Sequence, residues 1–243
     1  MFSIFGKGAF YSWEWGKPVI AGIGGSIAIN DVSLIDNIRE HYSQFNTPSF
    51  TRTLKVTLQY YGFGFLYSPK KYWFVRETFR KMSSLGIMEG NYNPVQEGGA
   101  EDFRMKMNEG SFKRLNENIE RIKEISNHST QIATEYTRIF ENTPITLPKI
   151  PTNSKAVFNR FPIFVKNKKD LLSMARQTNI ELADWYNTPI HPLVGDDLRK
   201  VFYEPGECPN AEYAAETLVS LPTNEKVGKE FLNRFFAIFE NAE

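Results

Sequence analysis

Apolar residues recur at the three- and four-residue spacing of an α-helix in several stretches of the chain. The clearest stretch runs from Ser111 to Phe140, where Phe112, Leu115, Ile119 and Ile122 lie on one face. Further helices are predicted over 32–45, 49–63, 167–179, 210–221 and 225–243. Prolines break this helical pattern, at Thr47-Pro48 and in the stretch after Phe140.

Short runs rich in β-branched residues predict strands among these helices. Pro18–Gly22 and Ser26–Ile29 are separated by Ile23-Gly24-Gly25, which predicts a hairpin or a bulge. Further along, strands are expected over 157–165 and 179–182. The mixture of helices and strands predicts an α/β fold.

Glycine, proline and asparagine mark the boundaries between these regions. Residues 67–99 mix short helical pieces with such breakers and are expected to form a long excursion. Residues 142–155 carry Pro144, Pro148 and Pro151 and are typical of a domain crossover. We therefore predict three parts: 1–110, a connecting helix and linker over 111–155, and a small α/β domain over 156–243.

Composition and charge exclude several classes of protein. The 243 residues contain 29 Lys and Arg against 28 Asp and Glu, so no overall charge attracts nucleic acid. The stretch Val56–Pro69 is shorter than a membrane span and contains Gln59. Cys208 is the sole cysteine, which excludes an internal disulfide and agrees with a reducing cytoplasm. We expect Cys208 to be a small buried residue with no role in the chemistry.

One lysine has unusual neighbours. Lys17 lies between the turn Trp15-Gly16 and Pro18, and an apolar run with Gly22, Gly24 and Gly25 follows. A lysine amine becomes a nucleophile when it is held beside a carbonyl with which it condenses, as in Schiff-base enzymes. Lys17 and the hydroxyl of Ser12, five residues earlier, are therefore candidates for holding a phosphate-bearing aldehyde cofactor.

The stretch S-W-E-W-G-K-P-V-I-A-G-I-G-G (Ser12–Gly25) resembles the cofactor-lysine segment of the DegT/DnrJ/StrS family of sugar aminotransferases. That family's pattern has a serine, an aromatic residue, the lysine, apolar residues and Gly-Glu-Gly-Gly, and then a strand that ends in Asn-Asp. Asn30-Asp31 stands at the matching place, and Ile23 replaces the usual Glu.

The second half of the chain carries two further parts of the pattern. Trp185–His191 (W-Y-N-T-P-I-H) is similar to the family's His-Tyr-x-x-Pro-Leu-His, with Trp185 in place of the first His. Phe202–Pro222 is similar to its Tyr-x-x-Gly-x-x-Pro-x-Ala-Glu run. The resemblance implies that Trp185 and His191 contact substrate; the alternative is that both side chains are packed against a domain face.

A loop before the long helix also has a counterpart in the family. F-R-M-K-M-N (Phe103–Asn108) lies where the family carries an Arg or Asn that reaches the partner subunit's cofactor. The resemblance makes Arg104 a candidate for substrate binding and Asn108 a candidate for cofactor binding. The alternative for both residues is an ordinary role in starting the helix.

Taken together, the resemblance implies the C-terminal portion of a fold type I enzyme that depends on pyridoxal 5'-phosphate (PLP). Lys17 would form the Schiff base and then act as general base, and Ser12 would hold the phosphate. The substrates would be a nucleotide-linked keto sugar and an amino donor such as glutamate. The partner would be a second copy in a homodimer or a polypeptide that supplies the N-terminal half.

Several alternatives stay open at this point. The chain could be a fragment, one half of a split enzyme, or an inactive remnant. It could also be a non-catalytic interaction module that docks through its aromatic-rich first third. A third interpretation is peripheral membrane association through Tyr60–Tyr67; it is disfavoured because Lys70 and Lys71 form the only nearby basic cluster.

Overall fold

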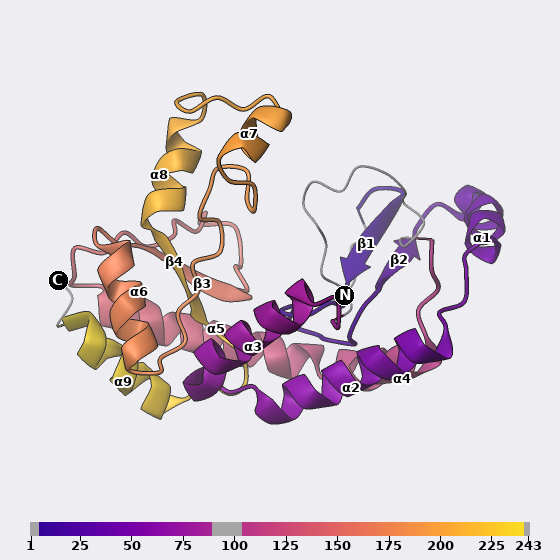
Figure 1. Ribbon diagram of the computed structural model, residues 1–243, viewed down its shortest axis with the longest axis horizontal. Coiled ribbons are helices and arrows are strands. Elements are labelled where there is room, and N and C mark those ends of the chain that lie inside the picture. Colours follow the sequence, from indigo (N-terminus) through magenta and orange to yellow (C-terminus); the bar gives the residue numbers. More distant parts are fainter. Residues whose placement is uncertain (1–4, 89–103, 241–243) are drawn as a thin grey trace. The chain divides into compact units, whose positions relative to one another are not determined.

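The computed structural model describes residues 5–88 and 104–240, and the chain divides into two compact units. Each unit mixes helices with a two-stranded antiparallel sheet (Figure 1). The first unit comprises Met1–Phe65, Phe79–Tyr92 and Gln96–Lys123, and the second comprises Leu66–Thr78, Asn93–Val95 and Glu124–Glu243.

The strands are β1 (Gly8–Ser12), β2 (Gly25–Ile29), β3 (Arg160–Phe164) and β4 (Leu218–Pro222). The α-helices are α1 (Ile35–Ser43), α2 (Phe50–Leu66), α3 (Tyr72–Ser84), α4 (Glu109–Ile119), α5 (Ile122–Phe140), α6 (Lys168–Gln177), α7 (Asp196–Lys200), α8 (Pro209–Thr217) and α9 (Lys229–Glu240). Two 3₁₀ turns, η1 (Val32–Leu34) and η2 (Pro69–Lys71), precede α1 and α3. No described helix is both long enough and apolar enough to cross a membrane.

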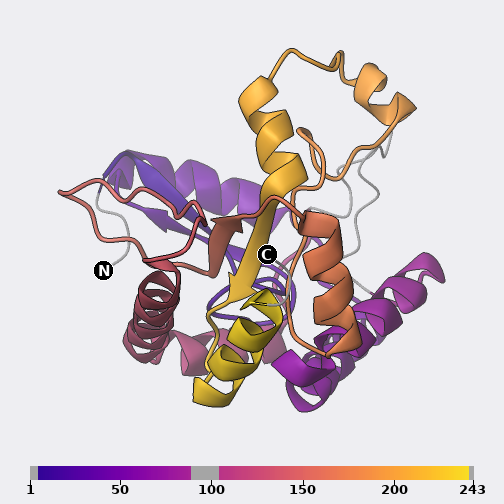
Figure 2. The ribbon, with the colours of Figure 1, turned by 90° about the vertical axis from the view of Figure 1, so that its left-hand side faces the viewer.

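The second unit contains the larger hydrophobic core, which surrounds the sheet of β3 and β4. The two strands pair from Arg160 opposite Pro222 to Phe164 opposite Leu218. Figure 2 shows α6 and α9 beside each other near this sheet. Phe235 of α9 is fully buried and packs against the rings of Tyr136 and Phe231. Aromatic side chains from α5 and α9 thus account for much of the core.

Two predictions in this second unit are wrong. The predicted helix 210–221 ends at Thr217, and residues 218–222 form β4 instead. All but the first residue of β4 are buried, so pairing with β3 and packing override the local helical pattern. The predicted strand 179–182 is not a strand; only Ala183 pairs with β4, through two hydrogen bonds with Ser220 of 2.9 and 3.0 Å.

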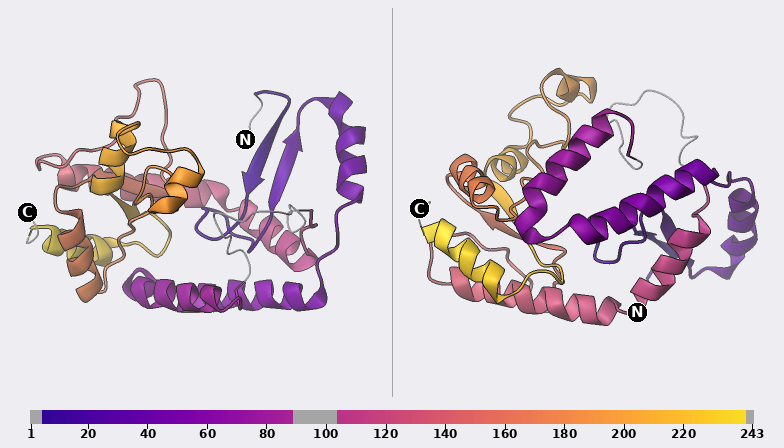
Figure 3. Two further views of the ribbon diagram at one scale, coloured as in Figure 1. Left: turned by 45° about the horizontal axis from the view of Figure 1, so that its top comes forward. Right: turned by 60° about the horizontal axis from the view of Figure 1, so that its bottom comes forward.

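The first unit contains the hairpin of β1 and β2, which Figure 3 shows as two antiparallel arrows. Ser12 is paired with Gly25, so the loop of the hairpin spans residues 13–24. The predicted strand 18–22 is wrong, whereas 26–29 lies within β2. Gly22 and Gly24 adopt positive φ angles of 112° and 127°, which interrupt an extended conformation.

The helical predictions elsewhere are largely confirmed. The stretch 32–45 contains η1 and α1, and 49–63 lies almost wholly within α2. The predicted excursion 67–99 contains one 13-residue helix, α3, and its residues 89–99 lie outside the described residues. The long helix 111–140 is two helices, because the N–H of Arg121 bonds the carbonyl of Asn118, three residues back.

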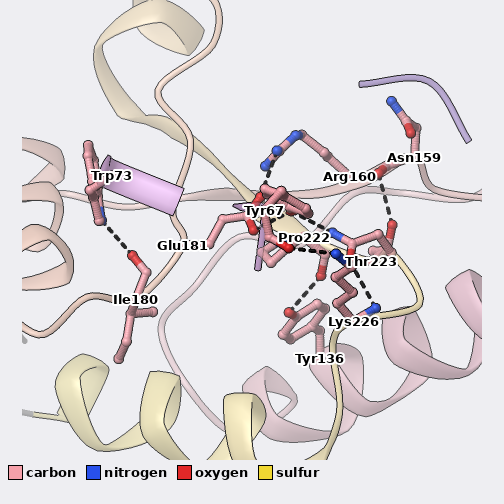
Figure 4. A network of polar contacts seen from close by, with 11 residues as sticks. Tyr67, Trp73, Tyr136, Asn159, Arg160, Ile180, Glu181, Pro222, Thr223 and Lys226 are labelled. Carbon is pink, nitrogen blue, oxygen red and sulfur yellow. Dashed lines mark hydrogen bonds and ion pairs between the residues drawn. The ribbon is translucent and has the colours of Figure 1, made fainter. Parts of the chain in front are cut away.

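A buried polar network lies against the sheet of the second unit (Figure 4). The carboxylate of Glu181 is fully buried and accepts hydrogen bonds from Tyr67 Oη at 2.5 Å and Arg160 Nη2 at 2.7 Å. Burial raises the pKa of Glu181, and Arg160 acts in the opposite direction. The network ties the segment before α3 to β3.

Candidate functional site

Lys17 lies on a tight turn in the loop between β1 and β2. The N–H of Lys17 donates to the carbonyl of Glu14 at 3.3 Å, and Gly16 within this turn has a φ of 76°. Lys17 is exposed, as are Gly16 and Pro18 on either side. The amine therefore stands at a solvent-accessible position on a turn whose conformation requires glycine.

The loop after Lys17 is held closely by backbone contacts. Val19 and Ala21 are buried, and the N–H of Ala21 donates to the carbonyl of Trp13 at 2.9 Å. The N–H of Trp13 in turn donates to the carbonyl of Gly24 at 3.0 Å. The exposed lysine thus lies in a loop whose later residues are buried or hydrogen-bonded to Trp13.

Two polar side chains of α4 fix the same loop from outside. Arg114 Nε donates to the carbonyl of Ala21 at 3.2 Å, and its Nη2 donates to Ser111 Oγ at 2.8 Å. Asn118 Nδ2 donates to the carbonyl of Ile20 at 2.9 Å. The carbonyls of Ile20 and Ala21, which lie in the predicted strand 18–22, thus accept hydrogen bonds from side chains of α4.

Sequence reasoning missed Arg114 and Asn118 as functional candidates. Ser111, Arg114 and Asn118 recur at steps of three and four residues, so they share a face of α4 with buried Leu115. Polar residues at core positions of a helix are the signal that could have identified them, because buried polar groups require partners.

Aromatic rings cover the base of the lysine turn. The ring of Trp15 lies 5.6 Å from that of Phe63 and 6.5 Å from that of Tyr60, both in α2. The guanidinium of Arg114 stands 4.7 Å from the centre of the Tyr60 ring. The indole N–H of Trp13 donates to Ser26 Oγ at 3.0 Å. Trp15 of the turn thus packs against aromatic side chains of α2, and Arg114 of α4 packs against one of the same rings.

Ser12, Arg104 and Asn108 belong to the same unit as Lys17. Ser12 is the last residue of β1 and is exposed. Arg104 is also exposed, and its carbonyl accepts a hydrogen bond from the N–H of Asn46 at 2.9 Å. Phe103, at the start of the predicted loop, lies outside the described residues.

Asn108 caps the N-terminus of α4. Its Oδ1 accepts a hydrogen bond from the Ser111 N–H at 2.9 Å, and its Nδ2 donates to Ser111 Oγ at 3.1 Å. This is the helix-start role that the sequence offered as the alternative. The preceding Met107 lies against the lysine loop, since a Cβ on Gly24 would come within 2.9 Å of Met107 Cε.

Trp185 and His191 belong to the second unit and lie in the loop between Ala183 and α7. Trp185 is 49% exposed. His191 Nδ1 lies 2.9 Å from Asn187 Oδ1, and its ring meets that of Tyr186 edge-on at 5.6 Å. The loop therefore presents a cluster of Tyr186, Asn187 and His191 next to a half-exposed indole.

The second motif of this unit is held together by Tyr203 and Glu212. Tyr203 Oη donates to Glu212 Oε1 at 2.6 Å, and the N–H of Gly206 donates to the same oxygen at 2.5 Å. The hydrogen bond raises the pKa of Tyr203 to about 12 and lowers that of Glu212. Pro209 opens α8, as predicted, but Cys208 is exposed, so the expectation of burial is wrong.

Comparison with known proteins gives one family over almost the whole chain. The sequence model of the DegT/DnrJ/EryC1/StrS aminotransferase family matches residues 2–240. A search of curated proteins found no match.

Several solved structures share the fold. S. venezuelae DesV, solved with a ketimine intermediate, aligns with a TM-score of 0.65 and 18% identity over 98% of this chain and 52% of its own. Streptococcus pneumoniae Spr1654 in its PMP form aligns with a TM-score of 0.64 and 12% identity, over 98% of this chain and 54% of its own. Helicobacter pylori PseC is an aminotransferase involved in the biosynthesis of pseudoaminic acid. It aligns with a TM-score of 0.61 and 16% identity, over 98% of this chain and 54% of its own.

These similarities confirm the predicted fold class, α/β of fold type I. The chain spans about half the length of the solved structures that it matches.

Proposed function

Because the chain belongs to the DegT/DnrJ/EryC1/StrS aminotransferase family, we propose that Lys17 is the cofactor lysine of a PLP-dependent sugar aminotransferase. The reaction would move an amino group from a donor such as glutamate to a keto group on a nucleotide-linked sugar. The observation that carries this proposal is the exposed amine on a turn anchored by Arg114 and Asn118.

The known proteins that the chain resembles support the cofactor and the class of substrate. Spr1654 was solved in a PMP form and DesV with a ketimine intermediate, both of which belong to aminotransferase chemistry. PseC acts in the biosynthesis of pseudoaminic acid. We propose the same cofactor class for this chain and a sugar as the acceptor.

The residues around Lys17 fit two of the groups that PLP presents. Its aldehyde needs a primary amine within reach of solvent, and Lys17 is exposed on its turn. Its phosphate needs hydroxyl or N–H donors, and Ser12 is exposed at the end of β1. When bound, PLP supplies the electron sink that makes a proton on the neighbouring carbon of the substrate acidic.

The proposed roles of the chain's own residues follow from these positions. Lys17 Nζ would hold the cofactor covalently at rest and, once released, would accept and return the proton. Ser12 Oγ would donate to the phosphate. The roles of Asn108 toward the cofactor, and of Arg104, Trp185 and His191 toward substrate, stay predictions, and so does a cytoplasmic location.

A partner would complete the site. The chain spans about half the length of the solved structures that it matches. We propose that the other half of the family pattern completes the site, either in a longer native chain or in a second polypeptide, and that the complete enzyme is a homodimer.

Covalent trapping tests the role of Lys17. The purified chain is incubated with PLP and reduced with borohydride, and the modified lysines are identified by peptide mass spectrometry. We expect a pyridoxyl group selectively on Lys17 and its loss in Lys17→Arg. The matched control is Lys7→Arg, an exposed lysine of the same unit whose ion pair with Asp31 spans 3.7 Å.

Modification spread over many surface lysines, or unchanged in Lys17→Arg, would contradict the proposal. It would favour the non-catalytic interaction module instead. The same experiment, repeated with the other half of the family pattern present in a longer chain or as a second polypeptide, separates a site that needs completion from a site that is absent.

A further inference from the structure

Residues 180–184, which lead into the loop Trp185–His191, are held by two other segments of the second unit. One of them is β4, because Ala183 exchanges two backbone hydrogen bonds with Ser220. Residues 180–183 are also fully or almost fully buried. The loop therefore starts from a well-anchored segment.

The other anchoring segment is 67–76, which lies before and at the start of α3 (Figure 4). Tyr67 Oη donates to the carboxylate of Glu181 at 2.5 Å, and the indole N–H of Trp73 donates to the carbonyl of Ile180 at 2.8 Å. Both contacts reach buried residues. They fix the beginning of the anchored segment.

Arg76 of α3 makes the contact closest to the loop. Its Nη2 donates to Asp184 Oδ1 at 2.5 Å, and both side chains of this ion pair are partly buried. The guanidinium also lies 5.2 Å from the centre of the Trp73 ring and 6.0 Å from that of Tyr72. Because a hydrogen bond between charged groups is stronger than a neutral one, Arg76 holds the residue directly before Trp185.

A second base acts on the same carboxylate. Lys168, the first residue of α6, is buried and donates from Nζ to the carbonyl of Ala215 at 2.6 Å. Burial lowers the pKa of Lys168, and the charge of Asp184 acts in the opposite direction. Without Arg76 this attraction would remain, so Asp184 and the adjacent Trp185 would change position.

The loop itself has a strained backbone. Tyr186 has a φ of 66°, which is costly for a residue with a bulky side chain. Its ring meets that of His191 edge-on at 5.6 Å, and His191 Nδ1 lies 2.9 Å from Asn187 Oδ1. A strained conformation persists only where its surroundings hold it, and the anchored Asp184 lies two residues before Tyr186.

We propose that Arg76 is a positioning residue for the binding of the sugar substrate. By holding Asp184, it holds the loop that presents Trp185 and His191. The inference rests on the proposed function, in which these two side chains contact the nucleotide-linked sugar. Arg76 acts through Asp184 and needs no contact with the substrate, so its loss would weaken sugar binding and leave the amine of Lys17 as reactive as before.

Fluorine NMR on the full 243-residue chain measures the position of the loop. Labelling with 5-fluorotryptophan places one fluorine on each of the four tryptophans, and the variant Trp185→Phe identifies the signal of Trp185. In Arg76→Gln we expect this signal to shift and sharpen, while those of Trp13 and Trp15 stay in place. Arg76→Lys, which keeps a cation beside Asp184, should return the signal most of the way to its wild-type position.

Two further variants separate the ion pair from a general loss of structure. Asp184→Asn breaks the same pair without altering α3 and should move the Trp185 signal as Arg76→Gln does. The matched control Glu77→Gln breaks the ion pair of α3 with Arg176 and should leave the signal in place. A Trp185 signal that is unchanged in Arg76→Gln and Asp184→Asn, or that moves equally in Glu77→Gln, would overturn the proposal.

Calorimetric titration measures the consequence for sugar binding. The probes are glucose linked to UDP, dTDP, GDP or CDP, and we expect the wild type to bind at least one of them. Arg76→Gln should bind that probe about tenfold more weakly, the scale of one lost charged hydrogen bond, and Glu77→Gln should bind it as wild type does. Wild type that binds none of the four probes, or equal affinity in Arg76→Gln, would overturn the role in sugar binding.

Failure of this inference is distinguishable from failure of the proposed function. Trapping of a pyridoxyl group on Lys17 should be the same in Arg76→Gln as in wild type. A wild type that is not trapped there would contradict the proposed function, and the Trp185 signal would still show whether Arg76 positions the loop.

Discussion

Arg114 in α4 donates from Nε to the backbone carbonyl of Ala21 at 3.2 Å, four residues after Lys17. The guanidinium is buried between Ser111, the Tyr60 ring and this carbonyl. A charged donor thus adds to the backbone hydrogen bond from the Ala21 N–H to the Trp13 carbonyl in holding the lysine loop.

Replacing this donor should loosen the loop. Arg114→Met would remove the donor to the Ala21 carbonyl and one of the two donors to Ser111 Oγ, and we expect the free energy of unfolding to fall by about 2 kcal/mol. Urea unfolding measures it. The control Lys113→Met, at an exposed position of the same helix, should change it by less than about 0.5 kcal/mol. Equal losses in the two variants would show that Arg114 has no special role.

Gly16 and Gly22 both lie in the lysine loop but differ in what surrounds them. Substitution by alanine at each position separates the strain of a positive φ from the strain of a close contact. Both have positive φ, but a Cβ on Gly22 would also lie 2.9 Å from Val56 Cγ1, whereas nothing lies within 4 Å of one on Gly16. We expect Gly16→Ala to cost about 1 kcal/mol and Gly22→Ala about 3 kcal/mol in thermal or urea unfolding. A cost at Gly16 as large as that at Gly22 would contradict the close approach of α2.

The buried pair of Glu181 and Arg160 predicts a non-additive double mutant (Figure 4). Glu181→Leu would leave the guanidinium of Arg160 without its carboxylate, at a cost of about 3–5 kcal/mol. Adding Arg160→Met removes that unpaired charge, so the double variant should unfold at a higher urea concentration than Glu181→Leu alone. Additive losses would mean that the two groups do not interact energetically.

Acidification should weaken the contact between Tyr203 and Glu212. The hydrogen bonds from Tyr203 and Gly206 lower the pKa of Glu212 from its ordinary value of 4.5. A lowered carboxyl pKa stabilises the fold above the unfolded value, and this contribution is lost as the pH falls through the folded value. The stabilities of the wild type and Glu212→Gln in thermal unfolding should therefore differ most near neutral pH and converge as the pH falls below 4.5 and through the folded-state pKa of Glu212. A difference that stays constant down to pH 3 would argue against this ionisation.

Local signals in the sequence were sufficient for most helices and for the family. Apolar spacing indicated α1, α2, α6 and α9, and Pro209 marked the start of α8 because proline suits the first turn of a helix. The lysine motif and the two later motifs lie in contiguous segments, so they can be read without knowledge of the fold.

Local sequence patterns did not predict the contacts between segments that are distant in the chain. Residues 218–221 continue the predicted helix but belong to β4, because β3, more than fifty residues earlier, provides the hydrogen bonds and the buried surface. In the sequence, Arg114 and Asn118 are ordinary polar residues of a predicted helix. Only the structure shows that they donate hydrogen bonds to the carbonyls of Ala21 and Ile20.

The sequence by itself therefore determined the family, most of the helices and the position of Lys17, because each depends on neighbouring residues. Only the tertiary structure decided which strands pair, what holds the lysine loop, and that Arg76 pairs with Asp184. These features depend on which segments meet in space, and a side chain's partners there come from residues far away in the chain.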